Sequence, residues 1–342
     1  MGQKITLHDV AEKANVSIGT ASMALNAKPG VSPETRTRVL EAATELGYQV
    51  RIPVSVLSLR QLSTVGLVVK EDPGRAPKVN PFYSYVLAGV EAECRRQNLN
   101  LMYASVPVDN YNRISALPRM LVENRVDGLL IVGSFLDDAI AELAEQAGQI
   151  VSLVDSYTAT KAFDSVVSDN FGGAHAAVSH LIQMGHRCIG LIGSTPDAYP
   201  SIRDRRNGYL RALKDHGFRE TFIEDGDLTS EAAYQATRRL WEREPSLTAI
   251  FGCNDEVAIA AMRAALDSGR RVPEDLSIVG FDDIDLVQQV IPPLTTVHVD
   301  KLLMGALAVR QLVDRAQNPT RATITTVLNV HLIQRQSVRA PK

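Results

Sequence analysis

The chain has 342 residues, of which 45% are apolar and 22% are charged, and its formal net charge at pH 7 is −3. This length predicts two or three domains of about 150 residues each, and the composition excludes a largely disordered chain. Residues 1–60 hold seven Lys and Arg against five Asp and Glu, so a mildly basic head precedes an acidic body. Such an asymmetry is compatible with a head that binds nucleic acid, although it does not establish one.

The cysteines and the N-terminal segment indicate the compartment. Cys94, Cys188 and Cys253 form no Cys-x-x-Cys pair, so the sequence favours neither a zinc site nor a disulfide framework, and each is interpreted as a small core residue. The N-terminal segment lacks the apolar run of a signal peptide, and no stretch of about 18 apolar residues is present for a membrane span. These observations predict a cytoplasmic protein with no membrane partner.

The first 48 residues predict three short helices, each preceded by a hydroxyl side chain that can cap it. Thr6, Ser17 and Ser32 are the expected caps, Pro33 stands at a first helical position, and Gly47 is expected to end the third helix. The periodicity places these side chains on the inner faces of the three helices: Leu7, Val10, Ala11 and Ala14; Thr20, Ala21, Ala24 and Leu25; Val39, Leu40, Ala43 and Leu46.

Residues 49–61 break this pattern and are interpreted as a linker, in which Pro53 suits the start of a short helix. From Val65 onward, apolar runs alternate with helical patterns. Strands are expected at 65–69, 99–104, 128–132, 150–154, 188–192, 249–252 and 278–281. This alternation predicts an α/β body of parallel sheets with helices on both faces, and its size favours two lobes over one sheet.

Motifs of common enzyme classes are missing. The sequence contains no GxGxxG, Walker loop, HExxH or GxSxG, and none of the seven histidines pairs with another at the spacing of metal ligands. His186 lies in a turn before a strand and is interpreted as a structural residue. The sequence therefore predicts no catalytic residue, no metal and no cofactor.

The strongest local signal is a helix, a four-residue turn and a second, capped helix, which is the arrangement of a helix-turn-helix. Small polar residues gather at the second helix: Ser17, Thr20, Ser22 and Asn26. Side chains of this kind suit contacts with DNA phosphates, which position a protein on DNA without reading its sequence. The pattern alone leaves open a plain three-helix bundle that binds no nucleic acid.

The segment TLHDVAEKANVS at residues 6–17 resembles the opening of the LacI/GalR family of bacterial transcription regulators. Further segments resemble landmarks of that family in the expected order: 24–26, 31–36, 46–48, 80–83, 126–128, 168–170, 184–187, 205–209, 253–255, 279–283, 293–296 and 335–337. The ordered set covers nearly the whole chain, and it favours a regulator over a plain bundle.

The resemblance implies a helix-turn-helix DNA-binding domain over 1–48, a hinge over 49–61 and a two-lobed body, like a periplasmic binding protein, over 62–342. The first lobe would comprise roughly 62–166 with 296–323, and the second 167–293 with the C-terminal strand. An effector would bind between the lobes. Because no heptad segment follows 335–337, we expect a homodimer on two-fold, double-stranded operator DNA rather than a tetramer.

By this resemblance, the DNA-binding residues are Thr6, Ser17, Ile18, Gly19, Thr20, Ser22, Met23, Asn26, Ser32, Thr35, Tyr48 and Leu57. Met23 stands where relatives usually carry Arg or Lys, so base reading would depend on apolar contact with thymine methyl groups. The hinge also departs from the family, because Val50-Arg51 replaces the usual Pro-Asn. Leu57 matches the leucine that enters the minor groove in relatives.

Ligands of open parallel sheets bind beyond the carboxyl ends of the strands, and several candidate effector-binding residues follow predicted strands. The effector-binding residues implied by the resemblance are Phe82, Tyr83, Ser134, Arg205, Leu228, Asn254 and Asp282. Three of them have a structural alternative: Phe82 in the core, Arg205 in a surface ion pair, and Asp282 as a helix cap. Arg205 is expected to start a helix, and Leu228 stands where some relatives have an aromatic residue that stacks on the ligand.

The sequence is therefore interpreted as a DNA-binding transcription regulator, a repressor in the first instance, under the control of a small molecule. A sugar is the first expectation, because a guanidinium, an amide and a carboxylate suit neighbouring hydroxyls; a nucleobase or nucleoside is the second. Two other classes of protein fit the sequence less well. A solute-binding protein would need a signal peptide and no helix-turn-helix, and an α/β hydrolase would need a nucleophile with a base.

Overall fold

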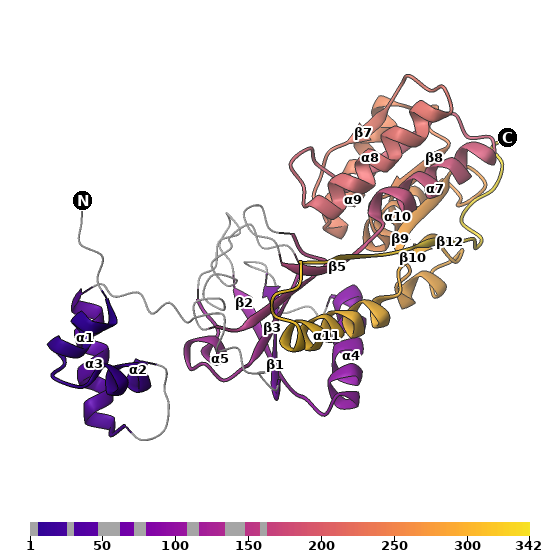
Figure 1. Ribbon diagram of the computed structural model, residues 1–342. Helices are drawn as coiled ribbons and strands as arrows, with labels where there is room; N and C mark the ends of the chain where they lie inside the picture. The colour runs from indigo at the N-terminus through magenta and orange to yellow at the C-terminus, as the bar shows by residue number, and fades with distance from the viewer. Residues whose placement is uncertain are drawn as a thin grey trace. The chain divides into compact units, whose positions relative to one another are not determined.

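The computed structural model describes residues 6–25, 31–46, 62–71, 80–107, 116–133, 148–157 and 163–342. The chain forms two compact units, Met1–Arg60 and Gln61–Lys342, which we describe separately (Figure 1). The predicted hinge lies outside the described residues, and so do four residues of the predicted sites: Asn26, Tyr48, Leu57 and Ser134. In the described part of the chain, no helix is long and apolar enough to cross a membrane.

The N-terminal unit contains the three predicted helices, α1 (Leu7–Lys13), α2 (Ile18–Leu25) and α3 (Pro33–Leu46). All three expected caps are present. The Thr6 hydroxyl accepts a hydrogen bond from the Asp9 amide in a capping box. The Ser17 and Ser32 hydroxyls accept from the backbone amides three residues later, at 3.0 and 3.2 Å. These bonds satisfy amides that a helix leaves without partners at its start.

A small apolar core holds the three helices together: Val10, Ala11, Ala14, Ala21, Ala24, Val39, Ala42 and Ala43. The prediction that Leu40 belongs to this core is wrong, because its side chain is 47% exposed. On α3 the inward stripe runs through Val39, Ala42 and Ala43, so Leu40 points away from it. The Arg38 Nε also donates to the Ala14 carbonyl oxygen at 3.0 Å, which ties α3 to the end of α1.

Two parallel sheets build the larger unit, and all seven predicted strands are present with small shifts at their ends. The first sheet contains β1 (Thr64–Glu71), β2 (Asn100–Pro107), β3 (Gly128–Val132), β4 (Ile150–Val154), β5 (Asp164–Ser168) and β11 (Thr325–Leu328), in the order β11-β5-β4-β3-β1-β2. Every strand pair in this sheet is parallel, as predicted.

The second sheet has the order β12-β10-β9-β8-β6-β7. Its strands are β6 (Ile189–Ile192), β7 (Phe222–Glu224), β8 (Ala249–Gly252), β9 (Ser277–Asp282), β10 (Thr295–His298) and β12 (His331–Ile333). All pairs are parallel except β10 with β12, which is antiparallel. A single antiparallel edge strand on an otherwise parallel sheet is common in α/β folds.

Helices cover both faces of each sheet, because neighbouring strand residues point to opposite sides. In the first lobe, α4 (Pro81–Arg96) and α11 (Lys301–Gln317) pack against Leu67 and Leu130, whereas α5 (Arg119–Val122) packs on the face of Val68 and Leu129. In the second lobe, α7 (Asn170–Gln183) and α8 (Pro200–Asp215) lie opposite α9 (Ser230–Arg243) and α10 (Asp255–Asp267). We use "first lobe" and "second lobe" for these two assemblies.

The chain passes between the two lobes at different residues from those predicted. The expected first lobe ended at 166 and resumed over 296–323, but β10 (Thr295–His298) belongs to the second sheet, where Thr295 pairs with Val279 of β9. The first sheet instead regains a strand at β11 (Thr325–Leu328), beyond the predicted limit. Short strands of mixed polarity such as these carry little apolar periodicity, which explains the error.

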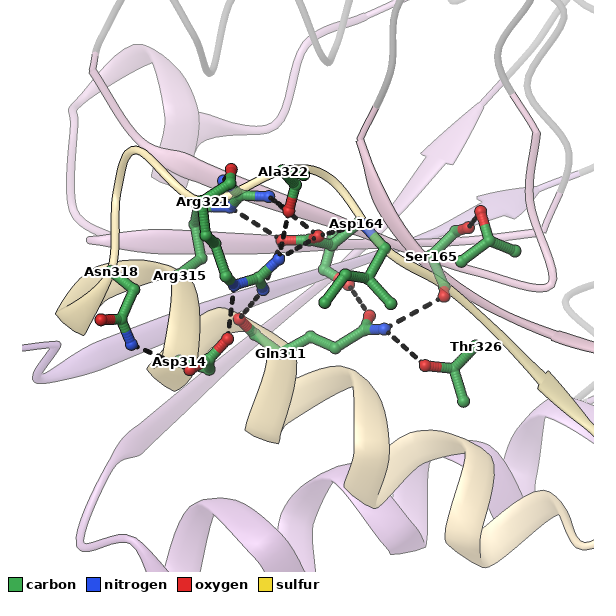
Figure 2. Close-up of polar contacts among 12 residues, drawn as sticks. Asp164, Ser165, Gln311, Asp314, Arg315, Asn318, Arg321, Ala322 and Thr326 are labelled. Atoms are coloured by element: carbon green, nitrogen blue, oxygen red, sulfur yellow. Dashed lines mark hydrogen bonds and ion pairs between the residues drawn. The ribbon is translucent and has the colours of Figure 1, made fainter.

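An ion-pair network fixes the connection between α11 and β11 (Figure 2). The buried carboxylate of Asp164 accepts two hydrogen bonds from Arg315, at 2.9 Å each, and two from Arg321, at 2.8 and 2.9 Å. The backbone amide of Ile324 adds a fifth at 2.9 Å. Burial alone would raise the pKa of Asp164, but the two guanidinium groups lower it overall.

Candidate functional site

The outward face of α2 presents apolar side chains. Ile18 is 49% exposed and Met23 is 36% exposed, and Gly19 between them is exposed as well. Ala21 and Ala24 on the opposite side are buried in the core of the unit, so the packing of α2 fixes which side faces outward. A surface of this kind can meet thymine methyl groups in a major groove, and it offers no side-chain donor for guanine at these three positions.

The hydroxyl residues of the predicted DNA-binding set cluster at helix starts. Thr6 and Ser17 cap α1 and α2, and the Ser17 hydroxyl also hydrogen-bonds to that of Thr20 at 2.9 Å. Ser32 caps α3 and donates to the Thr35 hydroxyl at 2.9 Å. These hydroxyl groups therefore have a structural role, because they cap the helices. The backbone amide groups at the same helix starts suit contacts with phosphate oxygens.

In the second lobe, Arg205 is the centre of a buried polar cluster. Its side chain is 5% exposed, so the alternative of a surface ion pair is wrong. Its Nε donates to Asn170 Oδ1 at 2.8 Å, its Nη1 donates to the carbonyl oxygen of Cys253 at 2.7 Å, and its Nη2 lies 2.9 Å from Asp282 Oδ1. The guanidinium also lies 3.8 Å from the centroid of the Phe281 ring.

The position of Arg205 within its helix also differs from the prediction. The expected helix start is wrong, because Pro200 begins α8 and Arg205 lies in the second turn. Pro200 is the first residue of the helix, the place that proline favours, so the helix starts five residues earlier.

Asp282 is the last residue of β9 and has a positive φ of 110°. The helical turn that follows, η2 (Asp285–Gln288), has Ile284 before it with no side-chain cap, so the cap interpretation of Asp282 is wrong. Burial raises the pKa of Asp282, while Arg205 and Lys301 act in the opposite direction. Lys301 is itself buried, and its Nζ donates to the carbonyl oxygens of Asp282 and Asp283 at 2.5 and 3.0 Å.

Asn254 and Asp255 lie at the start of α10, and both make contacts that stabilise the fold. Asn254 Oδ1 accepts a hydrogen bond from the Val257 amide at 2.9 Å, which makes Asn254 the cap of α10. The buried Asp255 accepts from the Thr296 hydroxyl at 2.5 Å and from the Ile284 amide at 2.9 Å. Asp255 therefore joins α10 to β10 and to the segment after β9.

In the first lobe, Phe82 and Tyr83 open α4. Phe82 is 7% exposed and packs in the main core, as its structural alternative predicted, with its ring edge-to-face on Tyr83 at 5.2 Å between centroids. The Tyr83 hydroxyl donates to Asp155 Oδ2 at 3.0 Å. Leu228 of the second lobe is half-buried and packs against both of its apolar clusters.

Sequence reasoning missed Asp155 and Asn170, although both lie within two residues of the end of a strand. Asp155 comes after β4 and Asn170 comes two residues after β5, so the rule of strand carboxyl ends applies to both. Burial raises the pKa of Asp155 to about 6, while the charge of Arg205 lowers it and that of Asp282 raises it further. Asp155 therefore lies close enough to the Arg205 cluster to interact with its charges.

Two side-chain contacts join the lobes outside this cluster. The Tyr85 hydroxyl on α4 donates to Asp285 Oδ2 at 2.5 Å, and the Lys70 ammonium on β1 donates to the Tyr199 hydroxyl before α8.

His186 hydrogen-bonds with the Thr248 hydroxyl and the Arg339 carbonyl oxygen, both at 2.9 Å, which confirms its structural role. Among the described residues, no group of three His, Cys, Asp or Glu side chains is placed to hold a metal ion.

Comparison with known proteins identifies the family. Residues 6–50 match "Bacterial regulatory proteins, lacI family", and residues 178–338 match a "Periplasmic binding protein-like domain". Over 97% of its length, the chain is 34% identical to the HTH-type transcriptional regulator CelR of Thermobifida fusca, of which it covers 98%. The chain belongs to the LacI family of bacterial regulatory proteins. The resemblance and the fold class predicted from the sequence are thereby confirmed.

Other LacI-family proteins match over similar lengths. The HTH-type transcriptional repressor PurR of Aliivibrio salmonicida is 31% identical over 97% of this chain and 98% of its own. The structure of a CelR–cellobiose complex has a TM-score of 0.73 at 32% identity, covering 97% of this chain and 99% of that one. The lac repressor dimer bound to operator and the anti-inducer ONPF has a TM-score of 0.70 at 26% identity, covering 99% and 100%. The LacI-family chain described here is a DNA-binding transcriptional regulator.

Proposed function

We propose that this LacI-family regulator is a cytoplasmic repressor whose affinity for operator DNA is set by a small sugar. The observation that carries the sugar proposal is the buried cluster of Arg205, Asp282 and Asn170, with Asp155 nearby, because it combines guanidinium, amide and carboxylate groups that suit hydroxyls. The similarity to a regulator solved with cellobiose supports the same choice. We propose that Phe82, Tyr83, Ser134, Leu228 and Asn254 complete the effector site.

A nucleobase or nucleoside is the second candidate effector, and the similarity to PurR favours it. We rank it lower because the aliphatic side chain of Leu228 offers no aromatic face on which a base could stack.

The proposed DNA contacts divide into two groups. Thr6, Ser17, Ser32 and Thr35 stand at helix starts and would place the unit on phosphates, with Thr20 and Ser22 beside them. Ile18, Gly19 and Met23 would meet base edges. Asn26, Tyr48 and Leu57 lie outside the described residues and stay predictions, as does the division into 1–48, 49–61 and 62–342.

The proposed mechanism is linkage between two sites. An effector that binds one arrangement of the two lobes better than the other would bias the protein towards that arrangement and change its affinity for DNA. A coupling free energy of about 1–3 kcal/mol would change operator affinity about 5–150-fold. A homodimer with two helix-turn-helix units would match a two-fold operator, as the solved lac repressor dimer on its operator supports.

A ligand screen on the full chain tests the proposal. Melting temperatures would be measured with cellobiose, ribose and glucose, and separately with hypoxanthine and guanine, and any compound that stabilises the protein would be checked for chemical turnover. We expect a sugar to raise the melting temperature of the protein and to be recovered chemically unchanged. Stabilisation by a nucleobase alone would replace the sugar proposal, and turnover of the ligand would contradict a regulator without catalysis.

A further inference from the structure

The turn that follows β9 has a strained backbone. Asp282 has a φ of 110° and Asp283 has a φ of 54°, so two successive residues other than glycine have positive φ. Such conformations are uncommon, and they persist where the surrounding structure imposes them. The turn also matters for the candidate site, because the Asp282 carboxylate lies 2.9 Å from the Arg205 guanidinium.

A lysine from the first lobe contacts both residues of this turn. Lys301 is the first residue of α11, and its Nζ donates to the carbonyl oxygens of Asp282 and Asp283 at 2.5 and 3.0 Å. A third bond, at 3.1 Å, goes to the carbonyl oxygen of Val299, just before the helix. One ammonium therefore binds the two carbonyl oxygens of the strained turn to the start of α11.

The ammonium of Lys301 is buried, and its charge is balanced by the second lobe. Lys301 is 6% exposed, and burial lowers its pKa. Four carboxylates act in the opposite direction and favour the charged form: Asp282, Asp283, Asp255 and Asp285. All four belong to β9, to the segment after it or to α10. An apolar side chain would avoid the cost of burying a charge, so the contacts of the ammonium need a reason beyond packing.

Other groups of the second lobe hold the side chain of Asp283 and the amide that follows it. The Asp283 carboxylate contacts His298 Nδ1 at 2.7 Å and accepts a hydrogen bond from Arg335 Nη2 at 2.6 Å. The Ile284 amide donates to the buried Asp255 at 2.9 Å. The turn is thus held from the second lobe through these groups and from the first lobe through Lys301.

We infer that Lys301 is a positioning residue of the effector site: from the first lobe, it holds the turn at 282–283 and so sets where the Asp282 carboxylate lies against Arg205. The inference rests on the proposed function, since it concerns the geometry of the same site. It also gives the two lobes a physical means of coupling, because a movement of α11 relative to the second lobe changes the contacts of the turn. Lys301 acts through Asp282 and needs no contact with the effector.

Amide hydrogen exchange of the ligand-free full chain tests this inference. Lys301→Met keeps a long side chain in the buried position but removes all three hydrogen bonds of the ammonium. We expect the amides of residues 283–290, with that of Ile284 as the reporter, to exchange about 10–100-fold faster, because a hydrogen bond from a charged donor contributes a factor of this size to local stability.

Gln311→Met is the matched control on the same helix. Gln311 also makes three hydrogen bonds, with Ser152, Ser165 and Thr326, but all of these partners lie in the first lobe. We expect this variant to leave the exchange of residues 283–290 unchanged. Equal acceleration in both variants, or acceleration by Lys301→Met that is confined to α11, would overturn the inference.

Lys301→Gln covers the case in which methionine prevents folding. Its side-chain amide can still donate a hydrogen bond near the turn, so we expect a smaller acceleration at the same residues. Unchanged exchange there in a folded variant would overturn the inference. Loss of folding in both variants would assign Lys301 to overall stability and would overturn it as well.

Operator affinity tests the coupling to the lobes. Fluorescence anisotropy without any ligand, on an operator obtained by selection from random DNA, should show that Lys301→Met changes Kd by at least about 5-fold and that Gln311→Met does not. An unchanged Kd for Lys301→Met would overturn the coupling through the turn. Failure of the wild-type chain to bind any selected DNA would contradict the proposed function instead, because the exchange measurement needs no DNA.

Discussion

On the exposed side of α2, Ile18, Gly19 and Met23 carry no strong hydrogen-bond donor. Met23→Arg would place a guanidinium there, and an arginine that forms two hydrogen bonds with guanine discriminates against other bases by about 1–3 kcal/mol. We expect the variant to select half-sites that are richer in guanine at one position. Selection from random DNA checks this, and identical half-sites for both proteins would show that Met23 does not read bases.

Part of the candidate site could be predicted from the sequence. Asp282 was found because it follows an apolar strand, and the same rule applied to the strand at 150–154 would have found Asp155. Lys301 could not be found in this way. Its ammonium donates to the carbonyl oxygen of Val299, two residues away, and to those of Asp282 and Asp283, which lie 19 and 18 residues away, and no local pattern signals the latter two contacts.

Between helices α4 and α11, two glycines allow the backbones to touch. A Cβ on Gly305 would lie 2.1 Å from the Val86 carbonyl oxygen, and one on Gly89 would lie 2.1 Å from the Leu302 carbonyl oxygen. Because backbone atoms cannot move aside as a flexible side chain does, Gly305→Ala should separate the helices at a cost of about 3 kcal/mol. Urea denaturation measures the loss.

Gly226→Ala is the control for this prediction, because a Cβ there meets only the Ala236 Cβ at 4.0 Å. We expect little change in its free energy of unfolding. Equal stabilities of the Gly305→Ala variant and the wild type would contradict the close packing of α4 against α11.

The same pair of helices carries a buried acid. Glu93 on α4 is 3% exposed, and its carboxylate accepts hydrogen bonds from Arg96 and from Arg310 on α11. The hydrogen bond from Arg96 has the largest effect on the pKa of Glu93 and lowers it. Burial acts in the opposite direction, and the bond from Arg310 lowers the pKa further, to about 2. Because the folded-state pKa lies below that of the unfolded chain, the stabilisation is present above about pH 4.5 and is lost as the pH falls towards 2.

Glu93→Gln tests this pH dependence. At pH 7 the free energy of unfolding of the variant should be about 2 kcal/mol lower than that of the wild type. This value is reduced because solvent screens the charges of the partly exposed Arg96 and Arg310. The difference should narrow as urea denaturation is repeated from pH 5 down to pH 3. A difference that stays constant over this range would show that the charge of Glu93 does not stabilise the packing.

The long apolar strands were predictable because each is buried on both faces of a parallel sheet. The strand β5 was missed because it begins with Asp164 and Ser165, which read as a break in an apolar run. The distant Arg315 and Arg321, together with the Ile324 amide, satisfy the buried aspartate there. Long-range compensation of this kind cannot be read from a local pattern.

Over the whole molecule, the order of landmarks along the chain was enough to predict the family and the two-lobed body. The residues at which the chain passes between lobes were not predictable to the same degree, because β10, β11 and β12 are short and their sheets are decided by pairing with distant strands. The sequence also left the effector open, since the polar residues of the cluster suit more than one class of ligand.

We expect one small molecule to control the affinity of this regulator for its operator. Fluorescence anisotropy with an operator obtained by selection from random DNA would measure Kd with and without the sugar that stabilises the protein. We predict a change of about 5–150-fold in Kd for the wild type. We also predict that Asp282→Asn, which alters the buried Arg205 cluster, binds the operator but loses this response. An operator Kd that the stabilising sugar does not change would contradict the control of DNA binding by this molecule.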